Sequence, residues 1–290
     1  MQNIEYLSDM KTYILNIKDC IAISNVLSPS LLTLSIAICI AACGNKNIKN
    51  PETDRITVTR SVHLTKDSDS PMCKVSMDII YVKDTEGEKS KSINNAIEKR
   101  LFDMSDVGMK HAADSFATRY TTEYMENFAA LYKADRGDEN KTSWYNFYYN
   151  IQTSVGNGKP GVMVYKIDSE YYEGGAHSIK QIFYLNFDNE TGKPLTVNDI
   201  FVPGHTKQLN SIVLDALKEK AEAEDINELQ DKGYLCSTEM FVPENFIIGE
   251  DGITFIYNTY EIAPYDNGMT ELYIRYSDIR KLMKSDNKNS

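Results

Sequence analysis

The chain has 290 residues, of which 42% are hydrophobic and 25% are charged, a composition typical of a folded globular protein and not of a disordered one. Its 31 Lys and Arg against 42 Asp and Glu give a formal charge of −11, which argues against nucleic-acid binding because phosphate contacts need clustered basic side chains. A basic partner is the better electrostatic match.

The N-terminal region contains a processing signal. Residues 31–42 are mostly apolar, and about a dozen such residues suit the core of a signal peptide better than a bilayer-spanning helix, which needs about 20. The tetrapeptide Ile40-Ala41-Ala42-Cys43 resembles the bacterial lipobox, whose cysteine receives lipid and becomes the new N-terminus. This resemblance implies a lipoprotein signal peptide over residues 1–42, lipidation of Cys43 and a flexible tether over residues 43–55.

The lipobox resemblance also implies a location. A lipidated Cys43 holds the protein in the cell envelope through its lipid anchor alone, and Gly44 beside it favours the outer membrane, with the protein facing the periplasm. Because 30 residues precede the apolar run, Met10 followed by Lys11 is an alternative start to Met1. An uncleaved membrane anchor reaching back to Ile21 is the other interpretation, and the polar residues and proline between Asn25 and Pro29 disfavour it.

Past the tether, alternating apolar and polar residues predict strands over residues 56–64 and 72–82. Apolar residues at three- and four-residue steps predict a helix that Ser92 caps, and then a longer helix over residues 109–134. The stripe of this second helix that we expect to face the core consists of Ala112, Phe116, Tyr120, Tyr124, Phe128 and Leu131.

The remaining elements are mostly strands. Three of them, over residues 144–155, 162–172 and 178–187, are separated by turns rich in Gly, Asn and Asp. A helix is expected around residues 209–217, then a hairpin of residues 246–248 and 253–257, an extended segment over 260–265, a strand over 272–276 and a short helix capped by Ser277.

Hairpin signals outnumber alternating strand–helix units along the chain. We therefore expect an α+β fold with a mostly antiparallel sheet, a few packed amphipathic helices and two intimately packed subdomains.

The stretch from Tyr171 to His177 reads Tyr-Tyr-Glu-Gly-Gly-Ala-His and stands between two predicted strands. The adjacent glycines, Gly174 and Gly175, let the backbone take a positive φ and let another group approach the chain closely, which strands avoid unless a bend or a contact requires it. The stretch therefore predicts a bend or a close contact at this position, but it does not identify a ligand.

A series of motifs follows in order along the second half of the chain: Tyr172-Glu-Gly-Gly-Ala-His177, Phe187-Asp188 with Thr191-Gly192-Lys193, Asp199-Ile200-Phe201, Asp251-Gly252 and Tyr260-Glu-Ile-Ala-Pro-Tyr265. Together they resemble the C-terminal domain of unknown function that RsiV-type lysozyme-sensing anti-sigma factors share with some exported polysaccharide deacetylases. The resemblance implies that residues 161–285 form this C-terminal domain and residues 56–160 the N-terminal companion domain that precedes it. Too few residues precede the apolar run to fold into a sigma-binding domain, so the resemblance implies only the exported sensory or binding half.

Two of these motifs provide the candidate site. A histidine and a carboxylate together can do general acid–base work, so His177 with Glu173 or Glu261 is the candidate catalytic set. The alternative, which we favour, is that both carboxylates satisfy backbone donors at bends and that His177 bonds to a neighbouring strand. The residues expected to bind a ligand are Gly174, Gly175, His177, Tyr260, Glu261 and Tyr265.

Metal sites and cofactors are not expected. The histidines, His63, His111, His177 and His205, never lie two to four residues apart, and no Cys-x-x-Cys occurs. Removal of residues 1–42 leaves Cys73 and Cys236, which could form one disulfide in an oxidising compartment or remain as free thiols.

These features favour a non-enzymatic lipoprotein that binds a macromolecule of the cell envelope. The partner would be a basic protein such as lysozyme, which suits the acidic charge, or cell-wall glycan, against which tyrosines can stack. The alternatives are an enzyme that acts on cell-wall glycan through His177 and a carboxylate, and an assembly or scaffold lipoprotein.

Overall fold

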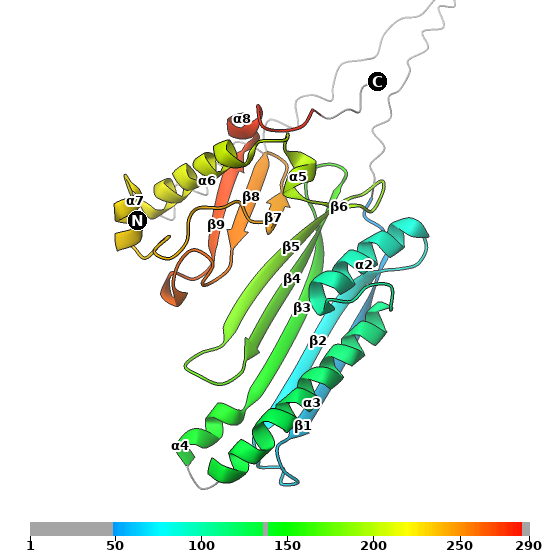
Figure 1. The fold of residues 1–290 in the computed structure, drawn as a ribbon. Helices are drawn as coiled ribbons and strands as arrows, with labels where there is room; N and C mark the ends of the chain where they lie inside the picture. The colour runs from blue at the N-terminus through cyan, green and yellow to red at the C-terminus, as the bar shows by residue number, and fades with distance from the viewer. Residues whose placement is uncertain (1–48, 136–138, 286–290) are drawn as a thin grey trace, which may run out of the picture. The chain divides into compact units, whose positions relative to one another are not determined.

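The computed structural model describes residues 49–135 and 139–285, which belong to one compact unit built on two sheets (Figure 1). The expected signal peptide and Cys43 lie outside the described residues. Within the described residues, no helix combines the length and the apolar character needed to cross a membrane.

The large sheet has its six strands in sequence order, and neighbouring strands are antiparallel except for β2 and β3. This pair is parallel because the chain between the two strands crosses over through helices α2 (Glu88–Phe102) and α3 (Met109–Asp135), followed by the short α4 (Glu139–Thr142) and η1 (Ser143–Tyr145). The strands are β1 (Thr53–His63), β2 (Met72–Val82), β3 (Phe147–Asn157), β4 (Val162–Tyr172), β5 (Ile179–Asp188) and β6 (Pro194–Leu195).

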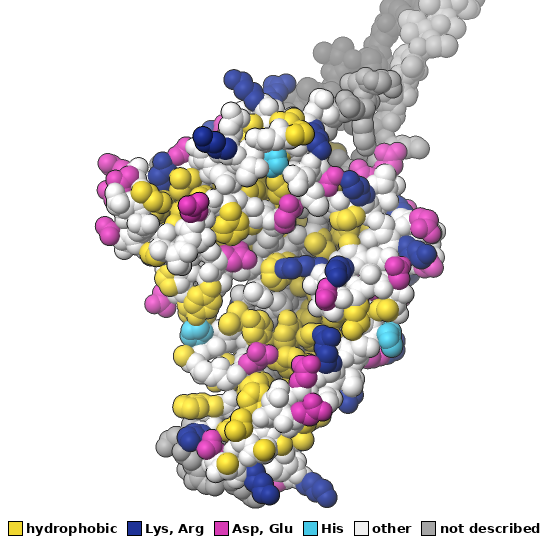
Figure 2. All heavy atoms as spheres, viewed as in Figure 1, with side chains coloured by type: hydrophobic (Ala, Val, Ile, Leu, Met, Phe, Trp, Pro, Cys, Tyr) yellow, Lys and Arg dark blue, Asp and Glu magenta, His cyan; other side chains and the backbone are white. Residues whose placement is uncertain are grey.

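Helices α2 and α3 cover one face of the large sheet, the side seen in Figures 1 and 2. Side chains alternate between the two faces of a strand, so every second residue of β2 to β5 points toward these helices. The residues on that side are apolar and form one core with the helices. Its buried strand residues include Val75, Met77, Ile79, Ile151, Tyr165, Ile167 and Phe187.

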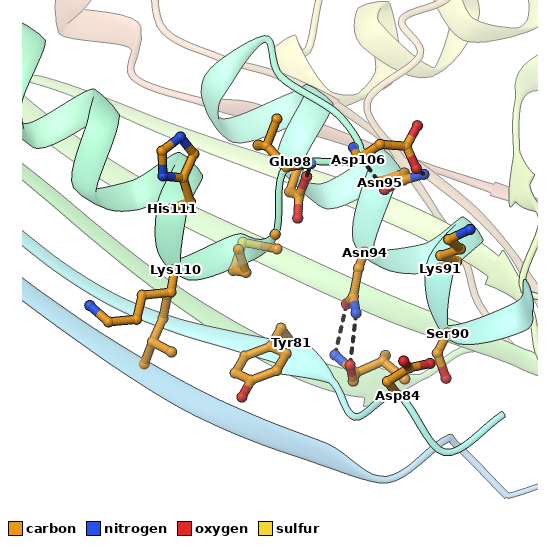
Figure 3. Close-up of a pocket in the computed structure, with 15 residues that line it drawn as sticks. Tyr81, Asp84, Ser90, Lys91, Asn94, Asn95, Glu98, Asp106, Lys110 and His111 are labelled. Carbon is orange, nitrogen blue, oxygen red and sulfur yellow. Dashed lines mark hydrogen bonds between the residues drawn. The ribbon is translucent and has the colours of Figure 1, made fainter. Parts of the chain in front are cut away.

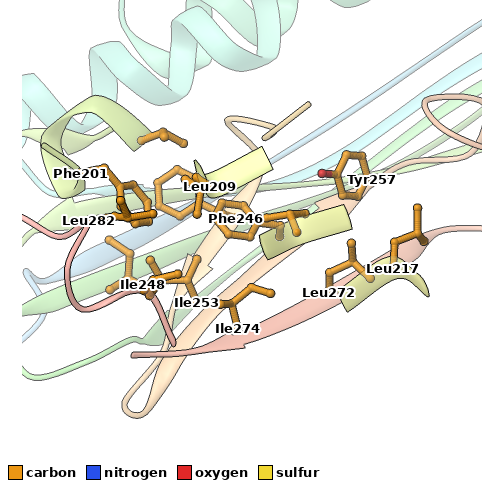
Figure 4. Packing of buried hydrophobic residues seen from close by; sticks show 14 of the residues in the cluster. Phe201, Leu209, Leu217, Phe246, Ile248, Ile253, Tyr257, Leu272, Ile274 and Leu282 are labelled. Atoms are coloured by element: carbon orange, nitrogen blue, oxygen red, sulfur yellow. The ribbon is translucent and has the colours of Figure 1, made fainter. Parts of the chain in front are cut away.

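The small sheet is antiparallel and consists of β7 (Phe246–Ile248), β8 (Gly252–Tyr257) and β9 (Thr270–Arg275). Helix α6 (Thr206–Ala221) packs its apolar stripe on this sheet, and the side chains interdigitate in a second core (Figure 4). The shorter helical elements nearby are α5 (Val197–Ile200), α7 (Ile226–Asp231), η2 (Tyr265–Asn267) and α8 (Tyr276–Ile279).

Three asparagine side chains join the small sheet to the outer edge of β5. Asn258 accepts a hydrogen bond from Ile182 N at 2.7 Å and donates to Ile182 O at 3.1 Å. Asn245 accepts from Tyr184 N at 2.9 Å, and Asn186 donates to Phe246 O at 2.7 Å. An amide side chain carries a donor and an acceptor side by side, so it replaces the backbone of a neighbouring strand.

The expected α+β fold with a mostly antiparallel sheet is confirmed. The strands predicted over residues 72–82 and 162–172 coincide with β2 and β4, and α3 begins at the residue predicted for it. The domain boundary expected after residue 160 falls in the turn between β3 and β4, which pair with each other in the large sheet.

Three predictions about residues in helices were wrong. Ser92 lies inside α2, where its hydroxyl donates to Gly192 O at 3.0 Å, and the helix begins after Gly87. Ser277 lies inside α8 and does not cap it. Leu131 is 54% exposed, because the stripe of α3 continues from Phe128 to Tyr132 at the four-residue step, and Tyr132 packs on Tyr145.

Two extended segments were also predicted wrongly. Trp144 belongs to the short helical turn η1 before β3 and is 56% exposed, so β3 begins three residues later at Phe147. The segment over residues 260–265 is a turn closed by a hydrogen bond from Tyr260 N to Ala263 O. Aromatic and polar residues alternate after Trp144 as they do in a strand, but residues 143–145 and 260–265 belong to neither of the described sheets.

Candidate ligand-binding face

The glycine-rich stretch forms the loop between β4 and β5. Gly174 and Gly175 have φ angles of 85° and 101°, and a Cβ on Gly174 would lie 3.0 Å from the carbonyl oxygen of Trp144. Both physical reasons for the glycine pair, a positive φ and a close approach, are therefore confirmed. The Tyr172 hydroxyl donates to Gly175 O at 2.8 Å and holds this loop against the end of β4.

This loop brings His177 against the turn that follows β8. The rings of His177 and Tyr265 stack with centroids 3.5 Å apart and planes at 17°, and the ring of Tyr260 lies 6.0 Å from that of Tyr265. All three residues are exposed. Tyr260 has a φ of 73°, a left-handed conformation that is unfavourable for a bulky side chain. The two motifs thus meet in an exposed aromatic cluster.

The two candidate carboxylates have other partners. Glu173 accepts a hydrogen bond from the Tyr120 hydroxyl of α3 at 2.7 Å, and Glu261 accepts one from Asn258 N at 2.9 Å. His177 Nδ1 lies 3.3 Å from Ser178 O. In residues 49–135 and 139–285, no carboxylate forms a hydrogen bond with His177, so the geometry provides no acid–base pair at this ring.

Beside the aromatic cluster, the face of the large sheet opposite the helices carries rows of polar side chains. Following the strand register, Ser76, Asn150, Glu170 and Lys180 are cross-strand neighbours in one row, and Asp78, Gln152 and Asp168 form the next. These seven residues line a hollow of about 380 Å³.

Two tyrosines border this hollow at the end nearest the glycine loop. Tyr148 and Tyr172 lie opposite each other on β3 and β4, with ring centroids 6.1 Å apart and planes at 27°. Glu170 accepts hydrogen bonds from the Tyr148 hydroxyl at 2.8 Å and from the Ser178 hydroxyl at 2.9 Å, and these two donors lower its pKa. We call the set of Tyr148, Asn150, Gln152, Asp168, Glu170, Tyr172 and Lys180 the polar face.

Charges on and around the polar face are balanced. Asp168 lies 3.3 Å from the Lys166 ammonium and 3.7 Å from that of Lys180, and Asp78 pairs with Arg55 at 2.8 Å. The face therefore offers amides, hydroxyls and compensated charges next to a tyrosine stack. Such a set can exchange many hydrogen bonds with a hydroxyl-rich ligand while the rings contact its apolar patches.

A larger hollow, of about 590 Å³, lies between the α2–α3 connection and the end of β2 (Figure 3). Most of its polar side chains form hydrogen bonds or ion pairs within the chain. Asn94 donates to Val82 O at 2.7 Å and accepts from Val82 N at 2.9 Å, and Asn95 donates to Asp106 at 2.7 Å. Glu98, only 2% exposed, accepts from Val107 N at 3.3 Å. We therefore assign this hollow a structural role.

The disulfide considered between Cys73 and Cys236 is not formed, and both residues are free thiols. Cys73 is fully buried among Tyr124 and Phe147, whereas Cys236 is exposed. Burial raises the pKa of Cys73 to about 12, so this thiol stays protonated at neutral pH and is a poor nucleophile.

A family described as "Protein of unknown function (DUF3298)" matches residues 198–277. A solved member of the DUF3298 family from Bacteroides fragilis aligns with a TM-score of 0.75 and 29% identity, over 83% of this chain and 96% of that one. A DUF3298 family protein from Pseudomonas aeruginosa aligns with a TM-score of 0.57 and 16% identity over 81% and 96%, and at this identity the likeness shows the fold alone. No curated protein matches the chain.

The DUF3298 match agrees with the expected domain of unknown function in the C-terminal half. The matched segment contains Tyr260, Glu261 and Tyr265 but not the polar face. Sequence reasoning singled out the glycine loop and its partner turn and missed the polar face. A signal was present, because Asn150 and Gln152 alternate with the buried Ile151 on one strand.

Proposed function

We propose that the protein is a lipid-anchored binding module of the cell envelope whose polar face takes a glycan chain of the cell wall. The observation that carries this proposal is the tyrosine pair, Tyr148 and Tyr172, beside a hollow lined by amides and charge-compensated side chains. Sugars present hydroxyls around their ring and C–H groups on its faces, so they need hydrogen-bond partners and an aromatic surface together.

Lysozyme, the basic protein considered as a partner, is the less favoured ligand of this face. The formal charge of −11 supports general attraction to a cationic protein. However, Lys166, Lys180 and Arg55 neutralise the carboxylates around the polar face, so the attraction is not concentrated there. The mixed donors and acceptors match a neutral hydroxylated polymer better.

The placement of Asn50 supports display from a lipid anchor. Asn50 donates to Gly156 O at 3.2 Å and to Asn157 Oδ1 at 2.9 Å, at the end of β3 opposite to Tyr148. At roughly 3.3 Å per residue, β3 separates these two ends by about 30 Å. A tether from a lipidated Cys43 would therefore join the body at one end of the sheet and leave the tyrosines at the far end, accessible to wall polymers.

Calorimetric titration of the purified protein with soluble oligosaccharides of N-acetylglucosamine tests the glycan proposal. We expect saturable binding that Tyr148→Ala weakens at least about tenfold, a loss of about 1.4 kcal/mol. The matched control is Tyr273→Ala, which removes an equally polar ring that is 54% exposed on β9. Equal effects of the two substitutions would contradict the assignment, and salt-sensitive binding of lysozyme without glycan binding would replace it.

Metabolic labelling with palmitate tests the anchor. We expect incorporation of the label into the protein and its loss in Cys43→Ser, because only that residue follows the lipobox-like small residues. Recovery of the unlabelled intact protein, with residues 1–42 still attached, from the soluble fraction of the cell would overturn this part of the proposal.

A further inference from the structure

A second pocket, on the helix side of the molecule, lies where β5 meets the small sheet. It has a volume of about 310 Å³ and is lined by residues of α2, β5, the segment before β7 and the turn after β8. Figure 2 shows hydrophobic side chains gathered between the helices and the small sheet, with basic and acidic side chains among them. We call the set of Arg100, Phe183, Phe241, Glu244 and Glu261 the edge pocket.

The guanidinium of Arg100 lies over an aromatic ring in this pocket. Its central carbon lies 3.5 Å from the centroid of the Phe183 ring. Stacking uses the face of the guanidinium and leaves the N–H groups at its edge to donate. No carboxylate of a described residue lies within ion-pair distance of Arg100, although Glu261 attracts it within the pocket. Its outer N–H groups are therefore available to a carboxylate from outside.

Two carboxylates of the edge pocket are oriented by the backbone. Glu261 accepts from Asn258 N at 2.9 Å, and Glu244 accepts from Val197 N at 2.9 Å, each through its Oε2 atom. Their Oε1 atoms accept no hydrogen bond from the described part of the chain and can receive an ammonium group. Glu261 is half-buried, and burial raises its pKa, while the hydrogen bond from Asn258 N and the charge of Arg100 act in the opposite direction. A cationic ligand would further offset the cost of its charge.

We propose that the edge pocket binds a free diamino acid, which carries one carboxylate and two ammonium groups. The ligand carboxylate pairs with Arg100, its side-chain ammonium pairs with Glu261 and its α-ammonium with Glu244, and its hydrocarbon chain lies along Phe183 and Phe241. One fixed cation and two fixed anions match the charges of a diamino acid. The volume is near the lower limit for ligand pockets, about 300 Å³, and suits a ligand of this size.

This site is separate from the polar face, because the residues that line the two hollows do not overlap. Ligand binding at one site therefore does not require binding at the other, and the two proposals can fail independently.

Titration of the purified protein with lysine, norleucine and lysine amide tests the proposal. Norleucine lacks the side-chain ammonium and lysine amide lacks the carboxylate, so we expect both to bind at least about fivefold more weakly than lysine. Arg100→Gln should weaken lysine binding at least about tenfold, and Glu261→Gln should remove the preference for lysine over norleucine while its side-chain oxygen still accepts from Asn258 N.

The matched control is Arg119→Gln on α3, an exposed arginine 6.0 Å from the Phe116 ring and outside the edge pocket, which should bind lysine as the unmodified protein does. An unchanged thermal midpoint shows that each variant is folded. Absence of saturable lysine binding, or equal binding of lysine and norleucine, overturns the proposal. Lysine binding without oligosaccharide binding supports the edge pocket and contradicts only the proposed function of the polar face.

Discussion

The two faces of the large sheet differ in composition although the same strands build both. Toward α2 and α3, Val75, Ile151 and Ile167 are 0%, 2% and 2% exposed, whereas Asn150 and Gln152 on the opposite side of β3 are exposed. Apolar side chains that a helix covers stabilise the fold because they are removed from water. Side chains on the open face stay in contact with water, so they can be polar. Polar side chains on the open face can therefore contact a ligand, and replacing them has little effect on the stability of the fold.

The open face itself contains the same contrast. At the end of β4 where the small sheet packs, Val162 and Val164 are buried in the core of that sheet. Further along the same side of β4, Lys166, Asp168 and Glu170 are polar. Residues of β4 are therefore apolar where another element covers them and polar where no described part of the chain does.

The largest expected effect contrasts two neighbouring residues of β3. Ile151→Ala should lower the free energy of unfolding by about 2 to 4 kcal/mol, because it removes buried methyl groups and leaves a cavity. Gln152→Ala on the open face should change it by less than about 0.5 kcal/mol. Chemical denaturation measures both changes. Similar losses of unfolding free energy in the two variants would contradict the proposed difference between the two faces.

A second prediction concerns the covered end of the sheet. Asn258→Ala should cost about 1 to 3 kcal/mol, because Asn258 is 2% exposed and the substitution leaves Ile182 N without its acceptor, whereas Ile182 O keeps the hydrogen bond from Asn245. Asn267→Ala is the control, since the Asn267 side chain makes one exposed hydrogen bond, to Lys232 O. Thermal unfolding measures the midpoints of the two variants. Equal midpoints would show that Asn258 does not stabilise the attachment of the small sheet.

A third prediction concerns the loop between the polar face and the aromatic cluster. Gly174→Ala should cost about 1 to 2 kcal/mol, because the residue has a φ of 85° and the added Cβ would lie 3.0 Å from Trp144 O. Gly87→Ala has a positive φ but open space around it, so its smaller loss isolates the contribution of the contact. Equal stability of the two variants in denaturant titrations would argue against the close approach.

The smallest expected effect is pH-dependent and lies on the polar face. Hydrogen bonds from Tyr148 and then Ser178 lower the pKa of Glu170, so its stabilising contribution is present above the usual glutamate pKa of 4.5 and disappears as the pH falls through the lower folded value. Glu170→Gln should therefore be less stable than the unmodified protein at pH 7 by a few tenths of a kcal/mol. A difference in stability between the two proteins that grows as the pH falls would contradict this prediction.

Local patterns predicted β2, β4 and α3 because each has a regular apolar period of its own. For the polar face, local alternation indicates which side of β3 is polar but not which residues of other strands lie beside it. Asn150 lies beside Glu170 only through the β3–β4 register, and Asp78 lies beside Gln152 only because β2 and β3 pair in parallel across two helices. Register depends on how the whole sheet assembles, which no short stretch of sequence specifies.

The two candidate carboxylates differ in how far their roles could be predicted. Glu261 accepts from a backbone N–H at a bend, as the favoured interpretation predicted, whereas the role of Glu173 could not be predicted. Glu173 bonds to Tyr120 and not to His177, a choice set by how α3 packs on the sheet. The meeting of His177 and Tyr265 was expected from the two motifs, but neither their stacked geometry nor the positive φ of Tyr260 was predicted. Distant packing decides these contacts, whereas the conformation of Gly174 and Gly175 could be predicted from the sequence alone.

The most direct test of the polar face as a glycan site is backbone amide chemical-shift mapping during titration with a tetramer of N-acetylglucosamine. The account predicts shifts concentrated in β3 and β4 around Tyr148, Asn150, Glu170 and Tyr172, with none along α2 and α3. Shifts confined to the helix-covered side, or no shifts at saturating oligosaccharide, would contradict it.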